Sequence, residues 1–598
     1  MISSFVLVHS AWIGLFLLIS LFALFASERL PPVILAASAG ASMLVLGYLP
    51  GEDMEQVFAN SAPITIAAMF VLSGALIRTG VVEALASAAS RRAKRSPRLS
   101  IAEILGGTFS ASALVNNTPV VIILIPIIRK VAEVTRISAK RLLIPLSYLS
   151  IMGGTLTLVG TSTNLLVDGI AQREGEPAFG IFELTQVGLI AAAAGVAFLL
   201  LAGRFLLPDG HGSEGKADAE PPLENRFLTE LRIDEDSDLV GTQYTALPML
   251  TRSGVSLSGF KRGRLIERKP DENAIVETGD RVLLAAEQTE LLSLVESYGD
   301  AIGVANNRTD MPKEQLRILQ ASIAPSHPAL GRGLAEIPFL AKTRARVIGL
   351  ARSRHFPGPT LSDVKLRAAD HLLIQGGPDC MRAIEANVNL IDIAEPAAKP
   401  YRRLKAPVAL GILVGIIGLA ALGVWTIELL AITGVALVLL TRCIDPEEAW
   451  RSIDGNVIVL IFGMLAFGVG LQKAGTMDLL VEAALPYATS LSPLFLLLAI
   501  YILTSLLTET VTNNAVAVIM TPIVLTLAEQ LGIDARPLLF AVMFAASASF
   551  ATPIGYQTNT IVYAAGGYRF VDFLKIGVPM NIVVGLATCL AIDWLVWK

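Results

Sequence analysis

Two polar stretches inside hydrophobic sequence carry the residues that could do chemistry. One is Ser112-Ala-Leu-Val-Asn-Asn-Thr-Pro-Val-Val121, and the other is Thr508-Glu-Thr-Val-Thr-Asn-Asn-Ala-Val-Ala517. The number of positions from Asn117 to Pro126 is the same as that from Asn513 to Pro522. Hydrocarbon offers amides and hydroxyls no partners, so such clusters inside a membrane usually face a cavity or another helix. The two stretches therefore predict a polar site within a membrane.

A second matched element follows each stretch. Gly160-Thr-Ser-Thr-Asn164 and Gly555-Tyr-Gln-Thr-Asn559 share the pattern G-x-x-T-N. A polar break in a membrane helix frees backbone carbonyls and creates new helix N-termini. A helix N-terminus is equivalent to roughly +0.5 charge and presents unpaired N–H groups to anions. The four breaks therefore provide groups that could bind an anion.

Neutral groups must compensate the charge of such an anion, because neither hairpin core nor the loops at 153–164 and 549–560 contain Lys or Arg. We expect amides and hydroxyls from the four breaks to bind the anion: Asn116, Asn117, Thr118, Thr163, Asn164, Thr512, Asn513, Asn514, Thr558 and Asn559. We expect oxygens of a partly overlapping set to coordinate a small hard cation, which the family resemblance described below identifies as sodium: Ser112, Asn117, Gly160, Thr508, Asn513 and Gly555. Glu509 is the one acid in either hairpin core, and it is either a proton or cation ligand or a cavity-facing or interfacial carboxylate.

Composition sets the class of protein. The chain has 598 residues, of which 53% are hydrophobic and 16% charged, against roughly 25% charged in soluble proteins. The net charge of −4 argues against a nucleic-acid partner. Cys380, Cys443 and Cys589 are isolated, and no nucleophile–base or metal constellation emerges, so an enzyme is not expected.

The apolar segments predict a polytopic α-helical membrane protein with about 11 transmembrane segments. Spanning helices are expected at 4–26, 32–49, 62–80, 184–207, 406–422, 424–441, 455–472 and 572–596. Segments 99–131 and 493–530 are interpreted as re-entrant hairpins, and 141–170 and 537–566 as interrupted helices. The first segment lacks a basic n-region and an obvious cleavage site, so it is interpreted as a retained helix.

Basic residues predict the orientation. The run at 91–98 places the end of the third helix in the cytoplasm. The hairpin at 99–131 then enters from the cytoplasm, and the hairpin at 493–530 enters from outside. Residues 1–207 and 401–598 are therefore expected to form an inverted-topology repeat, whose broken helices meet near the midplane.

Residues 208–400 have the composition of a soluble protein and contain a repeat of their own. The matched residues in the two copies are Ile233, Gly241, Gly259, Arg262 and Asp280, and Ile323, Gly331, Gly349, Arg352 and Asp370. A β-like run after a turn and then a helical run, at 288–297 or 378–387, occur in each copy. We predict two α+β domains on the cytoplasmic side, at 208–305 and 306–400.

The four motifs resemble those of the divalent anion/sodium symporter family, within the ion transporter superfamily. The family's Ser-Asn-Thr tips correspond to Asn116-Asn117-Thr118 and Thr512-Asn513-Asn514. Its Thr-Pro-Pro-Asn signature corresponds to Thr161-Ser162-Thr163-Asn164 and, more divergently, to Gly555-Tyr556-Gln557-Thr558-Asn559 preceded by Thr552-Pro553. The inserted pair looks like two TrkA-C domains. Thr-Asn-Asn in the second tip, together with these inserts, looks closer to the branch that contains algal and bacterial sulfate transporters.

The resemblance implies sodium-coupled uptake of a small divalent anion, with sulfate favoured, by an elevator-like alternating-access mechanism. It also implies a homodimer in the plasma (bacterial inner) membrane and a small-molecule ligand for the TrkA-C domains. A di- or tricarboxylate such as succinate or citrate is the alternative substrate. A TrkA-C-gated ion channel or a membrane sensor is the alternative of another class, although the chain has no potassium-filter signature of the Thr-Val-Gly-Tyr-Gly type.

Overall fold

The computed structural model contains two compact units. It describes residues 9–597 apart from 28, 82, 85–96, 136, 209–225, 253, 264, 269–270, 272–273, 306–315, 338–341, 344, 353–356, 359, 397 and 554. The first unit, called here the membrane unit, comprises Met1–Gly212 and Arg403–Lys598. The second, called the inserted unit, is Ser213–Arg402. Most of the basic run expected at 91–98 lies outside the described residues.

The membrane unit is built from two series of helices in the same order. The first series is α2 Ser10–Ser27, α3 Pro32–Val45, α4 Gly51–Phe58, α5 Ser61–Arg78, α7 Pro97–Ser112, α8 Asn117–Thr135, α9 Lys140–Gly154, α10 Ser162–Arg173 and α11 Thr185–Leu206. The second is α15 Ala406–Ala421, α16 Ile427–Leu440, α17 Pro446–Ser452, α18 Gly455–Lys473, α19 Thr476–Ala488, α20 Pro493–Thr508, α21 Asn513–Leu531, α22 Arg536–Ser547, α23 Gln557–Gly566 and α24 Phe570–Leu595. The short helices α4, α17 and α19 were not predicted from the sequence.

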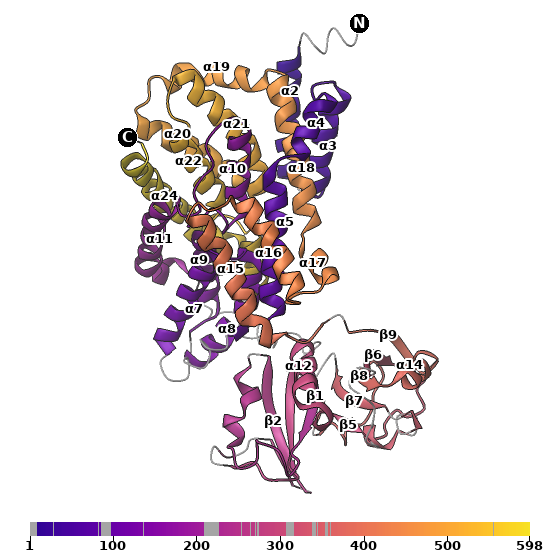
Figure 1. The fold of residues 1–598 in the computed structure, drawn as a ribbon. Coiled ribbons are helices and arrows are strands. Elements are labelled where there is room, and N and C mark those ends of the chain that lie inside the picture. The colour runs from indigo at the N-terminus through magenta and orange to yellow at the C-terminus, as the bar shows by residue number, and fades with distance from the viewer. Residues whose placement is uncertain are drawn as a thin grey trace. The chain divides into compact units, whose positions relative to one another are not determined.

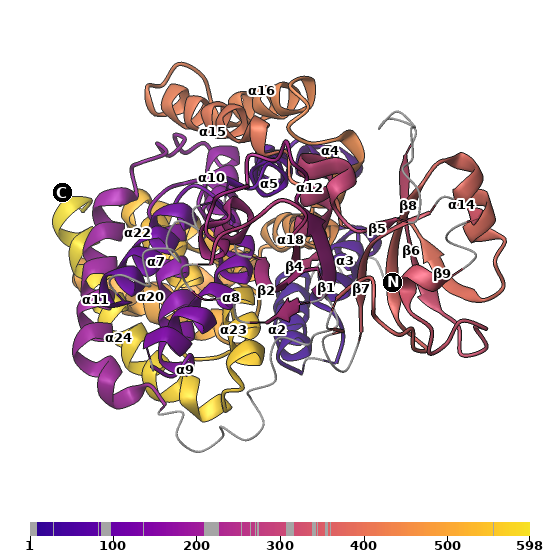
Figure 2. The ribbon, with the colours of Figure 1, turned by 90° about the horizontal axis from the view of Figure 1, so that it is seen from below.

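The two series pack on each other reciprocally. Helix α3 packs on α18 while α16 packs on α5, and α10 packs on α21 while α23 packs on α8. The last helices of the series, α11 and α24, lie side by side (Figures 1 and 2). The hairpin of α7 and α8 lies in the lower part of the membrane unit in Figure 1, and the hairpin of α20 and α21 lies in its upper part. Each of these contacts between the halves thus occurs twice, with the roles of the two halves exchanged, as a two-fold relation between them requires.

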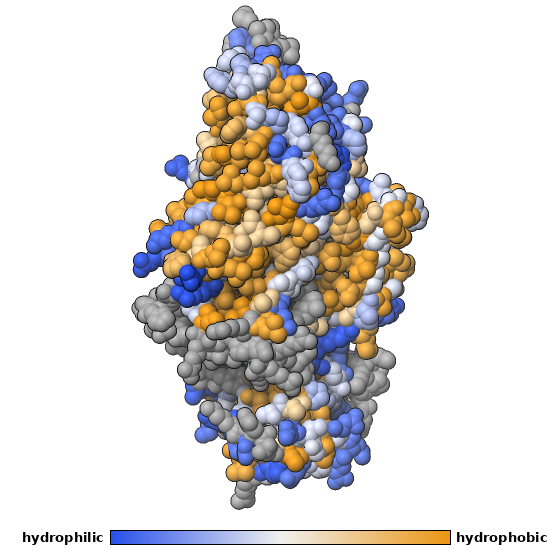
Figure 3. All heavy atoms as spheres, turned by 90° about the vertical axis from the view of Figure 1, so that its left-hand side faces the viewer, coloured by the Kyte–Doolittle hydropathy of each residue, from blue (hydrophilic) through white to orange (hydrophobic). Residues whose placement is uncertain are grey.

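Apolar surface identifies this unit as a polytopic membrane structure. Within the described residues, six helices are long and apolar enough to cross a membrane: Ser61–Arg78, Thr185–Leu206, Arg403–Ala421, Gly455–Lys473, Asn513–Leu531 and Phe570–Leu595. Large hydrophobic side chains are exposed on its outer helices, for example Leu200 and Phe205 on α11 and Trp594 on α24. Figure 3 shows a broad hydrophobic surface over the face that carries α11 and α24. Exposure on this scale is stable only against lipid or another protein.

Four helix breaks lie at the polar motifs. Helix α7 ends at Ser112 and α8 begins at Asn117, while α20 ends at Thr508 and α21 begins at Asn513. Residues 155–161 separate α9 from α10, and residues 548–556 separate α22 from α23. Each break therefore places a helix N-terminus inside the unit, at a residue that can bind a ligand.

The inserted unit contains one antiparallel sheet. Its strands are β1 Arg226–Arg232, β2 Val255–Arg262, β3 Leu265–Glu267, β4 Arg281–Glu287, β5 Val304–Ala305, β6 Arg317–Ile323, β7 Arg346–Ala351, β8 His371–Gly376 and β9 Leu390–Ala394. The order is β3-β2-β4-β1-β7-β8-β6-β9, with β5 also paired to β7. Helices α12 Gln288–Tyr298 and α14 Pro378–Glu385 follow β4 and β8. Because β1 pairs with β7, the sheet runs continuously through both sequence copies.

A buried ion pair recurs at the matched positions of the two copies. Arg262 Nε donates to Asp280 Oδ1 at 2.8 Å, and Arg352 Nε donates to Asp370 Oδ1 at 2.6 Å. Both carboxylates are fully buried and also accept a backbone N–H. Although burial opposes it, hydrogen bonds from Arg262 and Tyr244 lower the pKa of Asp280. The matched Arg and Asp residues thus fix the turn before each of strands β4 and β8.

Ala369 provides a prediction for the stability of the inserted unit. It lies in the turn before Asp370 with φ of 63°, whereas the equivalent residue in the first copy is Gly279, with φ of 86°. A left-handed conformation costs a residue with a Cβ atom roughly 1–2 kcal/mol. We expect Ala369→Gly to stabilise the unit by about 1 kcal/mol, measured by denaturant unfolding, and Gly279→Ala to destabilise it by a similar amount. Destabilisation by Ala369→Gly, or stabilisation by Gly279→Ala, would contradict the equivalence of the turns.

Candidate functional site

Each hairpin tip contacts the unwound segment of the other half. Thr118 Oγ1, in the first turn of α8, donates to Gln557 Oε1 at the start of α23, at 3.0 Å. Ser162 Oγ, at the start of α10, donates to Asn514 Oδ1 in the first turn of α21, at 3.0 Å. Thr163 Oγ1 also donates to Asn514 Oδ1, at 3.3 Å. The four helix N-termini thus meet in two reciprocal pairs.

Tyr556 joins the two pairs. Asn117 Nδ2 donates to its hydroxyl at 2.7 Å, and Thr161 Oγ1 lies 3.4 Å from the same hydroxyl. Tyr556 occupies the position that Thr161 holds in the first half, and its side chain is buried. Its place in the motif gave no sign of this role. Its place between Asn117 and Thr161 brings the breaks of both halves into one continuous polar site.

Paired threonines hold the unwound segments against the hairpins. Thr157 Oγ1 donates to Ala113 O at 2.5 Å, Gly160 N donates to Thr157 Oγ1 at 3.1 Å, and Asn164 Nδ2 donates to Thr157 O at 3.0 Å. The same three bonds, each 3.1 Å long, recur in the second half with Thr552, Glu509, Gly555 and Asn559. The full motif is therefore T-x-x-G-x-x-T-N. Its first threonine was not predicted in the first half, at Thr157, and in the second half Thr552 was noted only as a residue that precedes the signature.

The two motif glycines allow a close approach of the chain to itself. A Cβ atom on Gly160 would lie 2.4 Å from Gly154 O. A Cβ atom on Gly555 would lie 2.0 Å from Ser549 Oγ and 2.8 Å from Thr508 O. Only glycine fits at either place without a shift of these groups.

The remaining site residues expected from the sequence lie around these contacts. Ser112 and Ser150 share a hydrogen bond of 2.8 Å between their hydroxyls. Thr558 Oγ1 accepts from Ser147 Oγ at 2.8 Å. Thr512 precedes α21, and its buried hydroxyl has no partner among the described residues. These three residues thus lie on the hairpin tips and unwound segments whose contacts are described above.

Glu509 contacts neutral donors. Its carboxylate accepts from the backbone N–H groups of Ala551 and Thr552 at 2.8 Å each, from Ser549 Oγ at 3.2 Å and from Asn581 Nδ2 at 2.7 Å. Within the described part of the chain it has no ion-pair partner. Both oxygens are therefore engaged in fixing the second unwound segment, which favours a structural role beside the site over an interfacial one.

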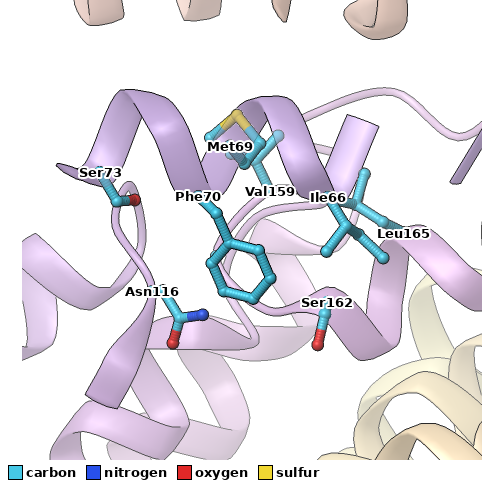
Figure 4. A pocket seen from close by; sticks show the side chains of 9 residues that line it. Ile66, Met69, Phe70, Ser73, Asn116, Val159, Ser162 and Leu165 are labelled. Atoms are coloured by element: carbon cyan, nitrogen blue, oxygen red, sulfur yellow. The ribbon is translucent and has the colours of Figure 1, made fainter. Parts of the chain in front are cut away.

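A small pocket opens at the first tip. It is lined by Ile66, Met69, Phe70, Ser73, Asn116, Val159, Gly160, Ser162 and Leu165. In Figure 4, the ring of Phe70 on α5 lies between the side chains of Asn116 and Ser162. Helix α5, which the sequence analysis treated as a plain spanning helix, thus forms one wall of the pocket.

The donors around this site are amides, hydroxyls and helix N-termini. In the described residues, no group of three or more His, Cys, Asp or Glu side chains gathers as a metal site. Amide, hydroxyl and backbone oxygens of this kind are ligands for hard cations.

These features define a polytopic membrane transport protein. The family model described as citrate transporter matches residues 22–520 and 510–598, and the chain belongs to this family. An uncharacterized transporter of Synechocystis sp. is 32% identical over 97% of this chain and 96% of its own. An uncharacterized transporter of Escherichia coli is 28% identical over 95% of this chain and 96% of its own. Sodium/sulfate cotransporter 2 of Chlamydomonas reinhardtii is 23% identical over 90% of this chain and 84% of its own.

Proposed function

We propose that the protein is a secondary active transporter that couples the uptake of a small divalent anion, with sulfate favoured, to sodium. The observation that carries the proposal is the meeting of four helix N-termini around amides and hydroxyls, without a basic side chain in the breaks. Helix N-termini favour negative charge. A dianion needs further compensation, which a co-bound cation supplies.

The adjacent amides support a compact, oxygen-rich anion. Asn116-Asn117 and Asn513-Asn514 place two amides at each tip, and each amide group carries two N–H donors. Relatives named as sodium/sulfate cotransporters support sulfate. A citrate or other carboxylate remains the second candidate, favoured by the description of the matching family.

The packing of the membrane unit supports alternating access. Helices α2–α5 and α15–α19 form one bundle, and α7–α11 and α20–α24 form another. Helix α18 packs on α21 and α5 packs on α10, whereas the equivalent pairs α5–α8 and α18–α23 do not pack along their lengths within the described structure. Alternating access moves one such bundle against the other around the site. We therefore assign the contacts α18–α21 and α5–α10 to one end state of transport. We assign the equivalent contacts α5–α8 and α18–α23 to the other end state.

Cysteine pairs test this assignment. On α18 and α21, a Cβ atom on Gly468 would lie 3.8 Å from Val518 Cγ1. The equivalent positions in the first half are Ser73 and Ile122. They follow from aligning Gly80 with Gly475 and Asn117 with Asn513. In a background without the three native cysteines, we expect both Gly468→Cys/Val518→Cys and Ser73→Cys/Ile122→Cys to form disulfides under turnover. Each disulfide should stop transport until it is reduced. Absence of the second cross-link in an actively transporting protein would contradict the exchange of contacts.

We further propose that the inserted unit is cytoplasmic and contains two TrkA-C domains, at 208–305 and 306–400. These domains bind a small-molecule ligand and thereby regulate transport. The transporter itself is a homodimer in the plasma (bacterial inner) membrane. The matched Arg–Asp pairs support the internal duplication.

Accumulation separates a transporter from a channel or a sensor. Proteoliposomes with an inward sodium gradient should accumulate labelled sulfate beyond its equilibrium concentration. A channel would only equilibrate the anion, and a sensor would not move it.

A further inference from the structure

The chain leaves the inserted unit by a short connection. Strand β9 ends at Ala394, and the 3₁₀ helix that leads into α15 begins at Arg403. The residues between them, 395–402, are called here the exit segment, and they include Pro396 and Pro400. The connection into the unit, between α11 and β1, is longer and comprises residues 207–225. A short segment with prolines is a semi-rigid spacer, so a displacement of the inserted unit reaches the membrane unit most directly through the exit segment.

Contacts fix the exit segment to the inserted unit. Tyr401 N donates to Ser293 Oγ on α12 at 2.9 Å. Ala398 packs against a hydrophobic core that is formed mainly by the first sequence copy. Helix α12 itself packs on β1 and β4 of the first copy and on β7 of the second. The exit segment is therefore attached to a helix that contacts both copies, and a change in the position of one copy against the other would displace it.

The residue after the exit segment holds the start of another connection. Arg403 Nη2 donates to Glu83 Oε2 at 3.1 Å. Glu83 is 7% exposed and lies after the end of α5, on the path to α7 and the first hairpin. The same turn of the chain contains a bond from Ala84 N to Gly80 O, at 2.9 Å. Helix α5 belongs to one bundle of the proposed alternating-access movement and α7 to the other, so this connection must change its course when the bundles move.

The second half shows no equivalent of this ion pair within the described residues. Aligning Gly80 with Gly475 matches Glu83 to Asp478, which lies in α19, on the corresponding path from α18 to the second hairpin. Asp478 is exposed, and no ion pair of its carboxylate is found in the described part of the chain. The same alignment matches Arg403 to Val8, whose side chain carries no charge. The pair is therefore an addition to the repeat, at the place where the chain returns from the inserted unit.

We infer that the Arg403–Glu83 pair is the point at which the inserted unit restrains the movement of the first hairpin. In the present arrangement Arg403 ties the connection from α5 to α7 to the start of α15. A displacement of the exit segment by the two copies separates the pair and frees this connection. Arg403 and Glu83 thus act as positioning residues. This inference deepens the proposed function, because it rests on alternating access and on regulation by the inserted unit, and it assigns the residues that join the two.

Hydrogen exchange of the purified full-length protein tests the restraint without a transport assay. Peptides that cover residues 79–84 contain the Ala84 amide, which exchanges when the turn at Glu83 opens. We expect Arg403→Gln and Ser293→Ala each to raise the exchange rate of these peptides at least threefold. Ser297→Ala, one turn further along α12 and exposed, is the matched control and should leave the rate unchanged. Unchanged exchange in Arg403→Gln or Ser293→Ala would overturn the inference.

Transport kinetics test the consequence of the restraint. The measurement is initial uptake of labelled sulfate into proteoliposomes under an inward sodium gradient. We expect Arg403→Gln and Glu83→Gln each to raise Vmax at least twofold at unchanged KM, because the restraint acts on the movement and not on binding. The double charge reversal Arg403→Glu/Glu83→Arg should return Vmax to the wild-type value, and Asp478→Asn should have no effect. A Vmax that falls or stays unchanged in both single variants would overturn the inference, since a merely structural pair gives no gain in rate.

The two measurements separate this inference from the proposed function. Faster exchange of residues 79–84 in both variants, in a protein that does not accumulate sulfate, would contradict the proposed substrate and support the restraint. Sulfate accumulation by the wild type, with unchanged exchange and unchanged Vmax in the variants, would contradict the restraint alone.

Discussion

Asn117→Ala and Asn513→Ala should each reduce sodium-driven uptake by about 10- to 100-fold, while the protein still assembles in the membrane. Both residues begin the helix that follows a hairpin tip, and both use their amides inside the site. Hydrogen bonds to charged groups contribute about 1.5–3 kcal/mol, and every 1.4 kcal/mol is a factor of ten. The measurement is initial uptake of labelled anion into proteoliposomes, normalised to reconstituted protein.

Asn456→Ala, at an exposed position in the first turn of α18, is the control and should transport normally. Normal transport by both site variants would remove the hairpin tips from the site.

Glu509→Gln should abolish both uphill uptake and exchange of the anion across the membrane. Each carboxylate oxygen of Glu509 accepts a backbone N–H, from Ala551 or Thr552. A glutamine would place its NH2 group against one of these donors, and an unsatisfied buried donor costs about 1–3 kcal/mol. The second unwound segment would then lose its fixed position beside the hairpin, so both modes of transport depend on the carboxylate.

Exchange of labelled for unlabelled anion separates this role from proton coupling. A glutamine resembles a protonated glutamate, so a proton carrier at this position would keep exchange and lose only uphill uptake. That result would contradict the structural role of Glu509. Glu482→Gln, on the exposed surface of α19, should leave both activities unchanged.

The helix breaks could be predicted because their residues are anomalous in a hydrophobic segment. Asn116-Asn117 and Gly160-Thr161 stand out from the apolar sequence on either side, and their recurrence in the second half excludes a random origin. The short helices α4, α17 and α19 could not be found in the same way. They are shorter than a membrane span, and α4 carries Glu52 and Asp53 in its first turn.

The residues that complete the site could not be identified because their roles come from tertiary contacts. Ser147 and Ser150 are single hydroxyls in an apolar helix, and either would ordinarily bond to its own helix backbone. Tyr556 looked like a departure from a motif, whereas its hydroxyl joins the two halves. The continuous sheet of the inserted unit also depends on the pairing of Leu228 with Leu350, which no local pattern reveals.

The central claim is sodium-coupled transport of a compact dianion at the meeting point of the four breaks. Its most direct test is uptake of labelled sulfate into proteoliposomes, with sodium and proton gradients imposed separately and with unlabelled thiosulfate, phosphate, succinate and citrate as competitors. We expect uptake to follow the sodium gradient alone and to be inhibited by thiosulfate more strongly than by succinate or citrate. Uptake that follows the proton gradient and ignores sodium, or competition by succinate or citrate but not by thiosulfate, would contradict the account.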